Sequence, residues 1–283
     1  MNPVTEIHVK NVYAYTGGRP FDAALPCVVF IHGALNDHSV WTLAARWFAH
    51  HGHSVLAIDL PGHGRSAGPV LPDVEAMADA VLALLDERGV GRAALVGHSM
   101  GSLIALEAAS RAAGRAAGGC TISHLVMVGT AYPMRVSAAL LDTAARQPLD
   151  AIDQVVTFSH ASMAAKPSYP GPGAWLHGAS RALMRQVLAR AEGVAGVEHN
   201  LFHHDFSACD RYAHGLDAAA VVRGSDTRCS LVVGARDRMT VPRQASTLAQ
   251  ALGAEVFTLP RAGHALMQED PDGLLGALRT ALA

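Results

Sequence analysis

The chain has 283 residues, of which 50% are hydrophobic and 16% are charged, and its formal net charge is −2. This length suits one large domain or one domain with an insertion, and the near-neutral charge gives no electrostatic reason to expect nucleic acid or an anionic membrane. No apolar run approaches the roughly 20 residues that span a bilayer, and residues 1–15 lack the apolar stretch of a secretory signal. We therefore expect a cytoplasmic protein with no membrane partner.

Short apolar runs alternate with amphipathic stretches through the first 130 residues. The predicted strands are residues 5–15 (an edge strand or hairpin), 28–31, 54–59, 93–96 and 124–128. The predicted helices are residues 40–50, 73–88 with Asp73 as the N-cap, and 102–113. We expect residues 114–119 to be a surface loop. This alternation indicates an α/β fold whose parallel sheet is covered on both faces, with functional residues in loops after the strands.

The most informative motif is Gly97-His98-Ser99-Met100-Gly101, between the predicted strand at 93–96 and the helix at 102–113. A G-x-S-x-G sequence in this context is typical of a serine held on a strained turn with its hydroxyl exposed. Gly97 and Gly101 are expected because side chains there would collide where the strand and the helix come close. We expect His98 to point away from the hydroxyl and to have a structural role.

A serine needs a base that takes its proton and an acid that orients the base. Asp237 follows the predicted strand at 230–234, and His264 follows the one at 255–259. The chain order Ser99, Asp237, His264 is that of one known group of triads. The competing carboxylates are Asp59, Asp205, Asp210 and Asp226. None of them both follows a core strand and precedes the histidine by one helix and one strand, so Asp237 is the predicted acid.

An oxyanion hole needs two backbone N–H groups directed at the developing negative charge. Met100, at the start of the helix after the serine, is one predicted donor. The loop His32-Gly33-Ala34 follows the strand at 28–31, and the N–H of Ala34 is the second. We expect His32 to hold this loop by hydrogen bonding.

These four segments, together with Asp59-Leu60-Pro61-Gly62-His63-Gly64-Arg65-Ser66, resemble the α/β-hydrolase superfamily in the correct order over nearly the whole chain. The resemblance implies a mostly parallel central sheet with helices on both faces and an inserted helical cap. The core domain would comprise residues 1–130 and 226–283. The cap would comprise residues 131–225, inserted after the sixth strand of the family's sheet.

Residues 131–225 indeed break the alternation of strands and helices. They contain helical patterns at 138–146, 179–190 and 200–218, and a loop rich in proline and glycine at 167–173. Such a cap would exclude water and line the acyl pocket. We expect two or three of seven apolar candidates to face that pocket: Met134, Phe158, Met163, Trp175, Met184, Phe202 and Phe206.

The 16 histidines raise the question of a metal. The best cluster comprises His199, His203, His204 and Asp205. His199 and His203 have the helical spacing of some zinc sites, but no glutamate lies between them and no pair of thiols is nearby. We predict solvated histidines, no metal and no cofactor. The four cysteines are widely spaced, and we expect free thiols, buried at Cys27 and Cys229.

The resemblance implies a serine hydrolase that cleaves a small to medium carboxylic ester, lactone or thioester through an acyl-enzyme at Ser99. Alternatives on the same scaffold are a C–C bond hydrolase, a perhydrolase or acyltransferase, and a receptor that binds a small ligand. Ser99 argues against haloalkane dehalogenases and epoxide hydrolases, which carry aspartate there. Ala265 argues against C–C hydrolases, which usually place tryptophan after the histidine, and the His-Gly-Gly-Gly loop of another esterase branch is absent. The expected partner is a small-molecule substrate, and the sequence makes no prediction of oligomeric state.

Overall fold

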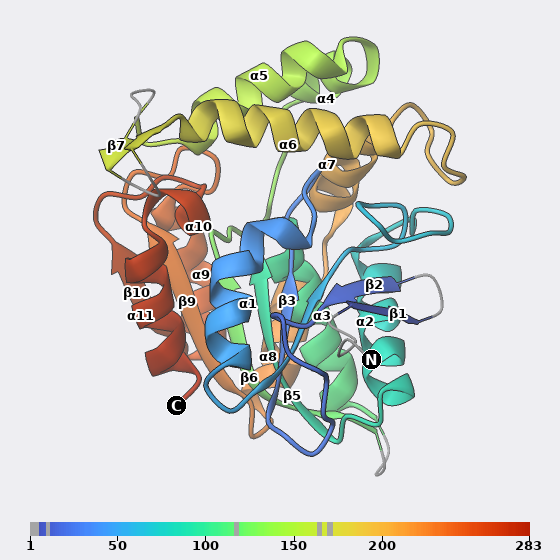
Figure 1. The fold of residues 1–283 in the computed structure, drawn as a ribbon, viewed down its shortest axis with the longest axis vertical. Helices are drawn as coiled ribbons and strands as arrows, with labels where there is room; N and C mark the ends of the chain where they lie inside the picture. The colour runs from blue at the N-terminus through green and yellow to red at the C-terminus, as the bar shows by residue number, and fades with distance from the viewer. Residues whose placement is uncertain (1–5, 10–11, 116–118, 163–165, 169–171) are drawn as a thin grey trace.

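The computed structural model describes residues 6–9, 12–115, 119–162, 166–168 and 172–283. Eight strands form one sheet in the order β1-β2-β4-β3-β5-β6-β9-β10 (Figure 1). The pairs β1–β2 and β2–β4 are antiparallel, and the other pairs are parallel. The strands are β1 (Glu6–Val9), β2 (Val12–Tyr15), β3 (Cys27–Ile31), β4 (Ser54–Ile58), β5 (Arg92–His98), β6 (Thr121–Val128), β9 (Arg228–Gly234) and β10 (Glu255–Leu259). The predicted hairpin at the start of the chain is confirmed as β1 and β2.

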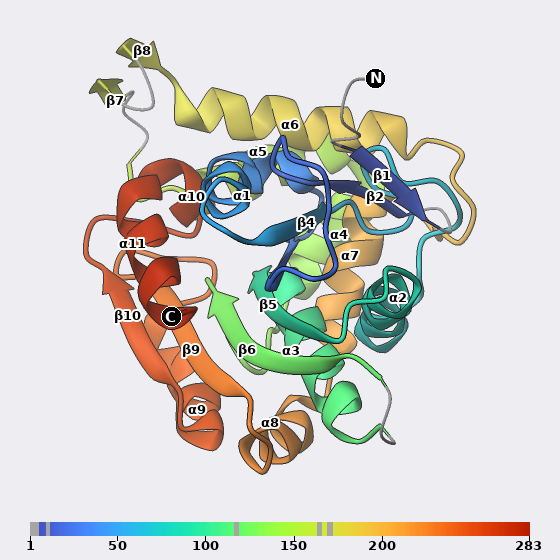
Figure 2. The ribbon, with the colours of Figure 1, turned by 60° about the horizontal axis from the view of Figure 1, so that its bottom comes forward.

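Helices cover both faces of the sheet, as Figure 2 shows. Because side chains alternate along a strand, Val28 and Phe30 of β3 face one layer while Val29 and Ile31 face the other. The first layer holds α1 (Thr42–Ala49), which follows the 3-10 turn η1 (His38–Trp41), and α11 (Pro271–Ala281). The second holds α2 (Val74–Glu87), α3 (Met100–Ala113), α8 (Gly215–Arg223) and α9 (Pro242–Leu252). The predicted α/β class is therefore confirmed.

A local signal sets the start of α2 as predicted. The side chain of Asp73 caps α2 by accepting a hydrogen bond of 2.7 Å from the N–H of Ala76. The predicted surface loop at 114–119 includes residues 116–118, which lie outside the described residues.

The single helix predicted over 200–218 is wrong, because the structure has two helices there. The first, α7, spans Leu201–Arg211 and packs against α4 and α3, whereas α8 packs against α3 and α9. The chain turns between them, and the hydroxyl of Tyr132 holds the turn by donating to Ala213 O and accepting from Gly215 N. A Cβ on Gly215 would collide with the Tyr132 ring. The helical pattern thus continues across a turn that a distant residue imposes.

The remaining elements between β6 and β9 lie across one end of the sheet (Figure 1). They are α4 (Ala138–Arg146), α5 (Pro148–Ser159), the antiparallel pair β7 (Lys166–Ser168) and β8 (Pro172–Ala174), and α6 (Leu176–Arg190). The loop predicted at 167–173 therefore lies partly in strands, and residues 169–171 lie outside the described residues. The division into a core and a cap at 131–225 stays a prediction.

All four cysteines are unpaired, with Cys27 buried and Cys229 half-buried. Among the described residues, no helix combines the length and the hydrophobicity needed to cross a bilayer.

Candidate active site

Ser99 lies on a strained turn between β5 and α3, with φ 53° and ψ −119°. Positive φ is unfavourable for residues with a side chain, and such strain is typical of functional turns. The turn brings β5 and α3 so close that a Cβ on Gly97 would collide with the carbonyl oxygen of Gly101. A Cβ on Gly101 would lie 2.5 Å from the carbonyl oxygens of Ile31 and of His32. The steric reason predicted for Gly97 is confirmed, whereas Gly101 is required by the close approach of α3 to the end of β3.

The loops after β9 and β10 bring Asp237 and His264 together. Oδ2 of Asp237 lies 2.8 Å from Nδ1 of His264, and both residues are buried. Thr240 donates its hydroxyl to the same Oδ2 at 2.7 Å, and Oδ1 accepts from the N–H groups of Met239 and Thr240. Burial alone would raise the pKa of Asp237, but the charge of His264 and the hydrogen bonds from His264 and Thr240 lower it below its ordinary value. The carboxylate is thus held ionised and oriented toward the imidazole.

Ser99 and His264 line the same cavity, which has a volume of about 360 Å³. Within the described part of the chain, the hydroxyl of Ser99 and Nε2 of His264 make no hydrogen bond to each other or to another residue. Hydrogen bonds between a nucleophile and its base are often long before substrate binds. The arrangement therefore leaves both reacting groups open toward a ligand in the cavity.

Two backbone amides near Ser99 are without an acceptor among the described residues, namely those of Ala34 and Met100. Ala34 lines the cavity in the loop after β3, and Met100 is the first residue of α3, where amides lack partners within the helix. A Cβ on Gly33 would lie 3.1 Å from Cβ of Ser99, so this loop passes directly beside the serine. Both predicted donors therefore lie next to Ser99 in the fold.

None of the competing carboxylates contacts His264 among the described residues. Asp59 pairs with His38, and Asp210 accepts a hydrogen bond from the N–H of Val136. Asp226 is exposed in a turn between α8 and β9. The fourth, Asp205, is buried and bonds to groups other than His264. Of these five carboxylates, Asp237 alone contacts His264 among the described residues.

His32 and His98 are buried, and each is hydrogen-bonded through its imidazole ring. Nδ1 of His32 donates to Gly33 O at 2.8 Å, and its Nε2 accepts from Leu60 N at 3.1 Å, so His32 holds the loop as predicted. Nε2 of His98 donates to the carbonyl of His264 at 2.9 Å. Burial, reinforced by neighbouring histidines, lowers the pKa of His32 to about 4 and that of His98 to about 3.

These two histidines predict a loss of stability in acid. Their folded-state pKa values lie below the unfolded value of about 6.5, so their stabilising contribution is complete above that pH. It is lost as the pH falls from about 6.5 toward 4 for His32 and toward 3 for His98, because the unfolded chain binds protons that the folded chain cannot. Urea unfolding followed by circular dichroism across this range should show a falling free energy of unfolding. In His98→Gln the fall should be shallower, whereas the surface variant His214→Gln should match the wild type; equal slopes in all three would contradict this account.

Four of the seven predicted pocket residues line the cavity, namely Met134, Phe158, Met184 and Phe206. Two do not. Phe202 is fully buried against Phe206, with ring centroids 4.7 Å apart, and Trp175 is 51% exposed before the first turn of α6. Met163 lies outside the described residues. The expectation of two or three lining residues was thus too low.

The histidines of the α7 region do not gather around a common point. The rings of His199 and His203 lie 4.6 Å apart, whereas His204 contacts Leu71 O with its Nε2 and Asp205 points toward the core. Among the described residues, the one group with converging metal-binding atoms is Asp37, His38 and Asp59.

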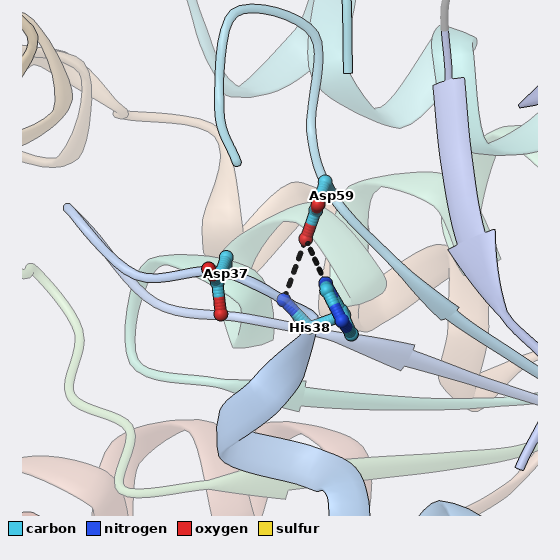
Figure 3. A group of neighbouring side chains, drawn as sticks. All are labelled: Asp37, His38 and Asp59. Atoms are coloured by element: carbon cyan, nitrogen blue, oxygen red, sulfur yellow. Dashed lines mark hydrogen bonds and ion pairs between the residues drawn. The ribbon is translucent and has the colours of Figure 1, made fainter. Parts of the chain in front are cut away.

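Figure 3 shows that Asp59 of this group is hydrogen-bonded to His38. Asp59 Oδ1 accepts from the backbone N–H of His38 at 2.6 Å and lies 2.8 Å from Nδ1 of the same residue, and Oδ2 accepts from Arg65 N. Asp37 caps η1 through Ser39. These hydrogen bonds explain why the three side chains lie close together: they stabilise the turn around η1.

Sequence analysis missed two positioning side chains. Thr240 stabilises Asp237, and its position three residues later in a turn is the signal that could have identified it. Glu269 is buried in α10 (Leu266–Glu269), where its carboxylate accepts from Gly263 N at 2.6 Å and from Ala161 N at 2.9 Å. It therefore ties the loop of His264 to the segment after α5, a contact that the local sequence cannot reveal.

A mostly parallel sheet with a strained serine between β5 and α3 defines the class of the protein as an α/β hydrolase fold. The chain belongs to the alpha/beta hydrolase family, whose model matches residues 28–277. The dihydrolipoyllysine-residue acetyltransferase component of the acetoin cleaving system of Pseudomonas putida is 30% identical over 261 residues, which are 89% of this chain and 60% of that protein. The chain therefore spans less than two thirds of that relative.

Solved structures have the same fold. The enol-lactonase from Burkholderia xenovorans LB400 superposes with a TM-score of 0.75 at 23% identity, covering 98% of this chain and 99% of that one. A thermophilic esterase superposes with a TM-score of 0.72 at 22% identity, covering 98% of this chain and 96% of that one.

Proposed function

We propose that the protein is a serine hydrolase that cleaves carboxylic esters, lactones or thioesters through an acyl-enzyme at Ser99. The observation that carries this proposal is the arrangement of Ser99 on a strained turn and the His264–Asp237 pair around one cavity. The proposal is supported by the fold shared with an esterase and an enol-lactonase.

In the proposed mechanism, Nε2 of His264 takes the proton of Ser99 as the serine oxygen attacks the substrate carbonyl. The N–H groups of Ala34 and Met100 bind the oxyanion that forms. His264 then protonates the leaving group, and water repeats the two steps on the acyl-enzyme. Asp237 keeps the proton of the neutral imidazole on Nδ1 and stabilises the imidazolium. These groups complete the reaction without a cofactor.

The cavity suits a small or medium acyl group. Met134, Phe158, Met184 and Phe206 come from the segment proposed as the cap, and they contribute apolar side chains to the lining of the cavity. Apolar walls with few polar groups are typical of small-molecule sites. In this proposal residues 131–225 act as a lid that excludes water from the acyl-enzyme.

A substrate screen tests the proposal. Nitrophenyl esters of increasing acyl length, lactones and thioesters are each mixed with the purified chain without added metal or cofactor. We expect saturable release of product, with a maximum at short to medium acyl chains. Binding of these compounds without turnover would contradict the proposal and support a receptor on this scaffold instead.

A further inference from the structure

A buried carboxylate joins α7 to the loop that carries Ala34. Asp205 is completely buried, and its Oδ2 accepts a hydrogen bond of 2.8 Å from the backbone N–H of Leu35. The same oxygen lies 2.9 Å from Nε2 of His63, which is also buried. These three groups come from α7, from the loop after β3 and from the loop after β4. Asp205 therefore connects the segment between β6 and β9 with two loops of the sheet.

The bond to Leu35 fixes the peptide that follows Ala34. Leu35 has φ 51°, and Ser99 is the only other non-glycine residue with positive φ among those described. This conformation is strained for a residue with a side chain and persists only where surrounding bonds hold it. Asp205 holds the N–H of the Ala34–Leu35 peptide, and the side chain of Asn36 donates to its carbonyl oxygen at 2.9 Å. Both polar groups of this peptide are thus held.

The preceding peptide, which carries the Ala34 N–H, is held from its other side. Its carbonyl belongs to Gly33 and accepts from Nδ1 of His32 at 2.8 Å. Two consecutive peptide planes are thus oriented by His32 and by Asp205, and the Ala34 N–H between them is left without an acceptor. That is the arrangement a preorganised oxyanion donor requires.

His63 neutralises the charge of Asp205. Both ring nitrogens of His63 face acceptors, since Nδ1 lies 3.2 Å from Pro61 O and Nε2 faces Asp205. Only an imidazolium donates at both positions. Burial alone would lower the pKa of His63, but Asp205, the Pro61 carbonyl and Asp59 raise it above its ordinary value.

This neutralisation matters because an unpaired carboxylate beside the oxyanion site would oppose the developing negative charge. The charged or titratable groups facing His63 are Asp205, Asp59 and the neutral His32, whose ring centroid lies 5.0 Å away.

We propose that Asp205 is a positioning residue for the oxyanion donor at Ala34 and that His63 is its required counter-charge. This inference rests on the proposed hydrolase function. Asp205 touches neither the serine nor the cavity; it acts through the Leu35 peptide. Its effect falls on the transition state, in which the oxyanion exists, and leaves substrate binding nearly unchanged.

The test is a set of variants assayed for kcat and KM on the best nitrophenyl ester. In Asp205→Ala we expect kcat to fall about a hundredfold, within the range for a lost oxyanion donor, with KM within about twofold. Asp205→Asn keeps an acceptor for the Leu35 amide and should recover most of kcat. The matched control is Asp210→Asn on the same helix, which keeps an acceptor for Val136 and should match the wild type.

A double-mutant cycle tests the counter-charge without relying on the alanine variant folding. His63→Gln leaves the buried carboxylate unpaired and should lower kcat by about tenfold or more. Asp205→Asn/His63→Gln restores a neutral pair and should be faster than His63→Gln alone. The wild-type kcat should also decline as the pH rises and His63 loses its proton, and this decline should be absent from the double variant.

The outcomes separate this inference from the proposed function. Two outcomes would overturn the positioning role alone, provided that the wild type turns over esters. One is an unchanged kcat in Asp205→Ala, and the other is additive effects of the two substitutions in the double-mutant cycle. Absence of turnover in the wild type would overturn the hydrolase function, and the positioning role with it.

Discussion

Replacing Ser99 by alanine is expected to lower ester turnover by roughly a millionfold, because no other group can form the acyl-enzyme. The hydroxyl sits on the strained turn at the end of β5 and faces the cavity shared with His264. A fluorophosphonate probe, which reacts with activated serines, should label the wild-type protein and leave Ser99→Ala unlabelled. Labelling is read on a gel, and turnover is read from nitrophenol release.

The matched control is Ser110→Ala, near the end of the same helix α3 and remote from the cavity. It should keep both labelling and turnover. Equal labelling of wild type and Ser99→Ala would place the reactive hydroxyl elsewhere and contradict the assignment of the nucleophile.

Asp237→Asn is expected to lower kcat by about 10⁴-fold with a small change in KM. The carboxylate accepts at 2.8 Å from Nδ1 of His264, so it keeps the proton on that nitrogen and leaves Nε2 free to act as the base. An asparagine amide facing Nδ1 favours the opposite tautomer, whose Nε2 already carries a proton. The measurement is steady-state kinetics on a nitrophenyl ester at neutral pH.

Asp226→Asn provides the control, because Asp226 is exposed and distant from His264 in the fold. It should behave as the wild type. A nearly normal rate in Asp237→Asn would mean that another group orients the imidazole, and the proposed acid would then be wrong.

Much of the fold and the approximate place of the site follow from the sequence, because the signals are local. A G-x-S-x-G motif between an apolar strand and a helix leaves few conformations for Ser99, and the glycines on either side permit the close approach seen in the structure. Apolar runs located the core strands because a sheet covered on both faces needs them. Since Asp237 and His264 directly follow two neighbouring parallel strands, their meeting could be expected.

The parts that sequence analysis missed depend on contacts between distant segments. Phe202 and Phe206 are one helical turn apart, yet only Phe206 reaches the cavity, and the packing of α7 decides which one does. The helical sequence pattern continues across the break between α7 and α8. The break depends on hydrogen bonds from Tyr132, roughly 80 residues earlier in the chain, which the local pattern cannot reveal. Asp205 was considered only as a metal ligand or an alternative acid, because its partner Leu35 is 170 residues away in the chain.

Trapping the acyl-enzyme tests the central claim most directly. The protein is mixed with an excess of a nitrophenyl ester, quenched in acid within the first turnover and digested for peptide mass spectrometry. The account predicts one added acyl mass per chain, located on Ser99. Ester hydrolysis that leaves Ser99 unmodified throughout, or an acyl group found on another side chain, would contradict it.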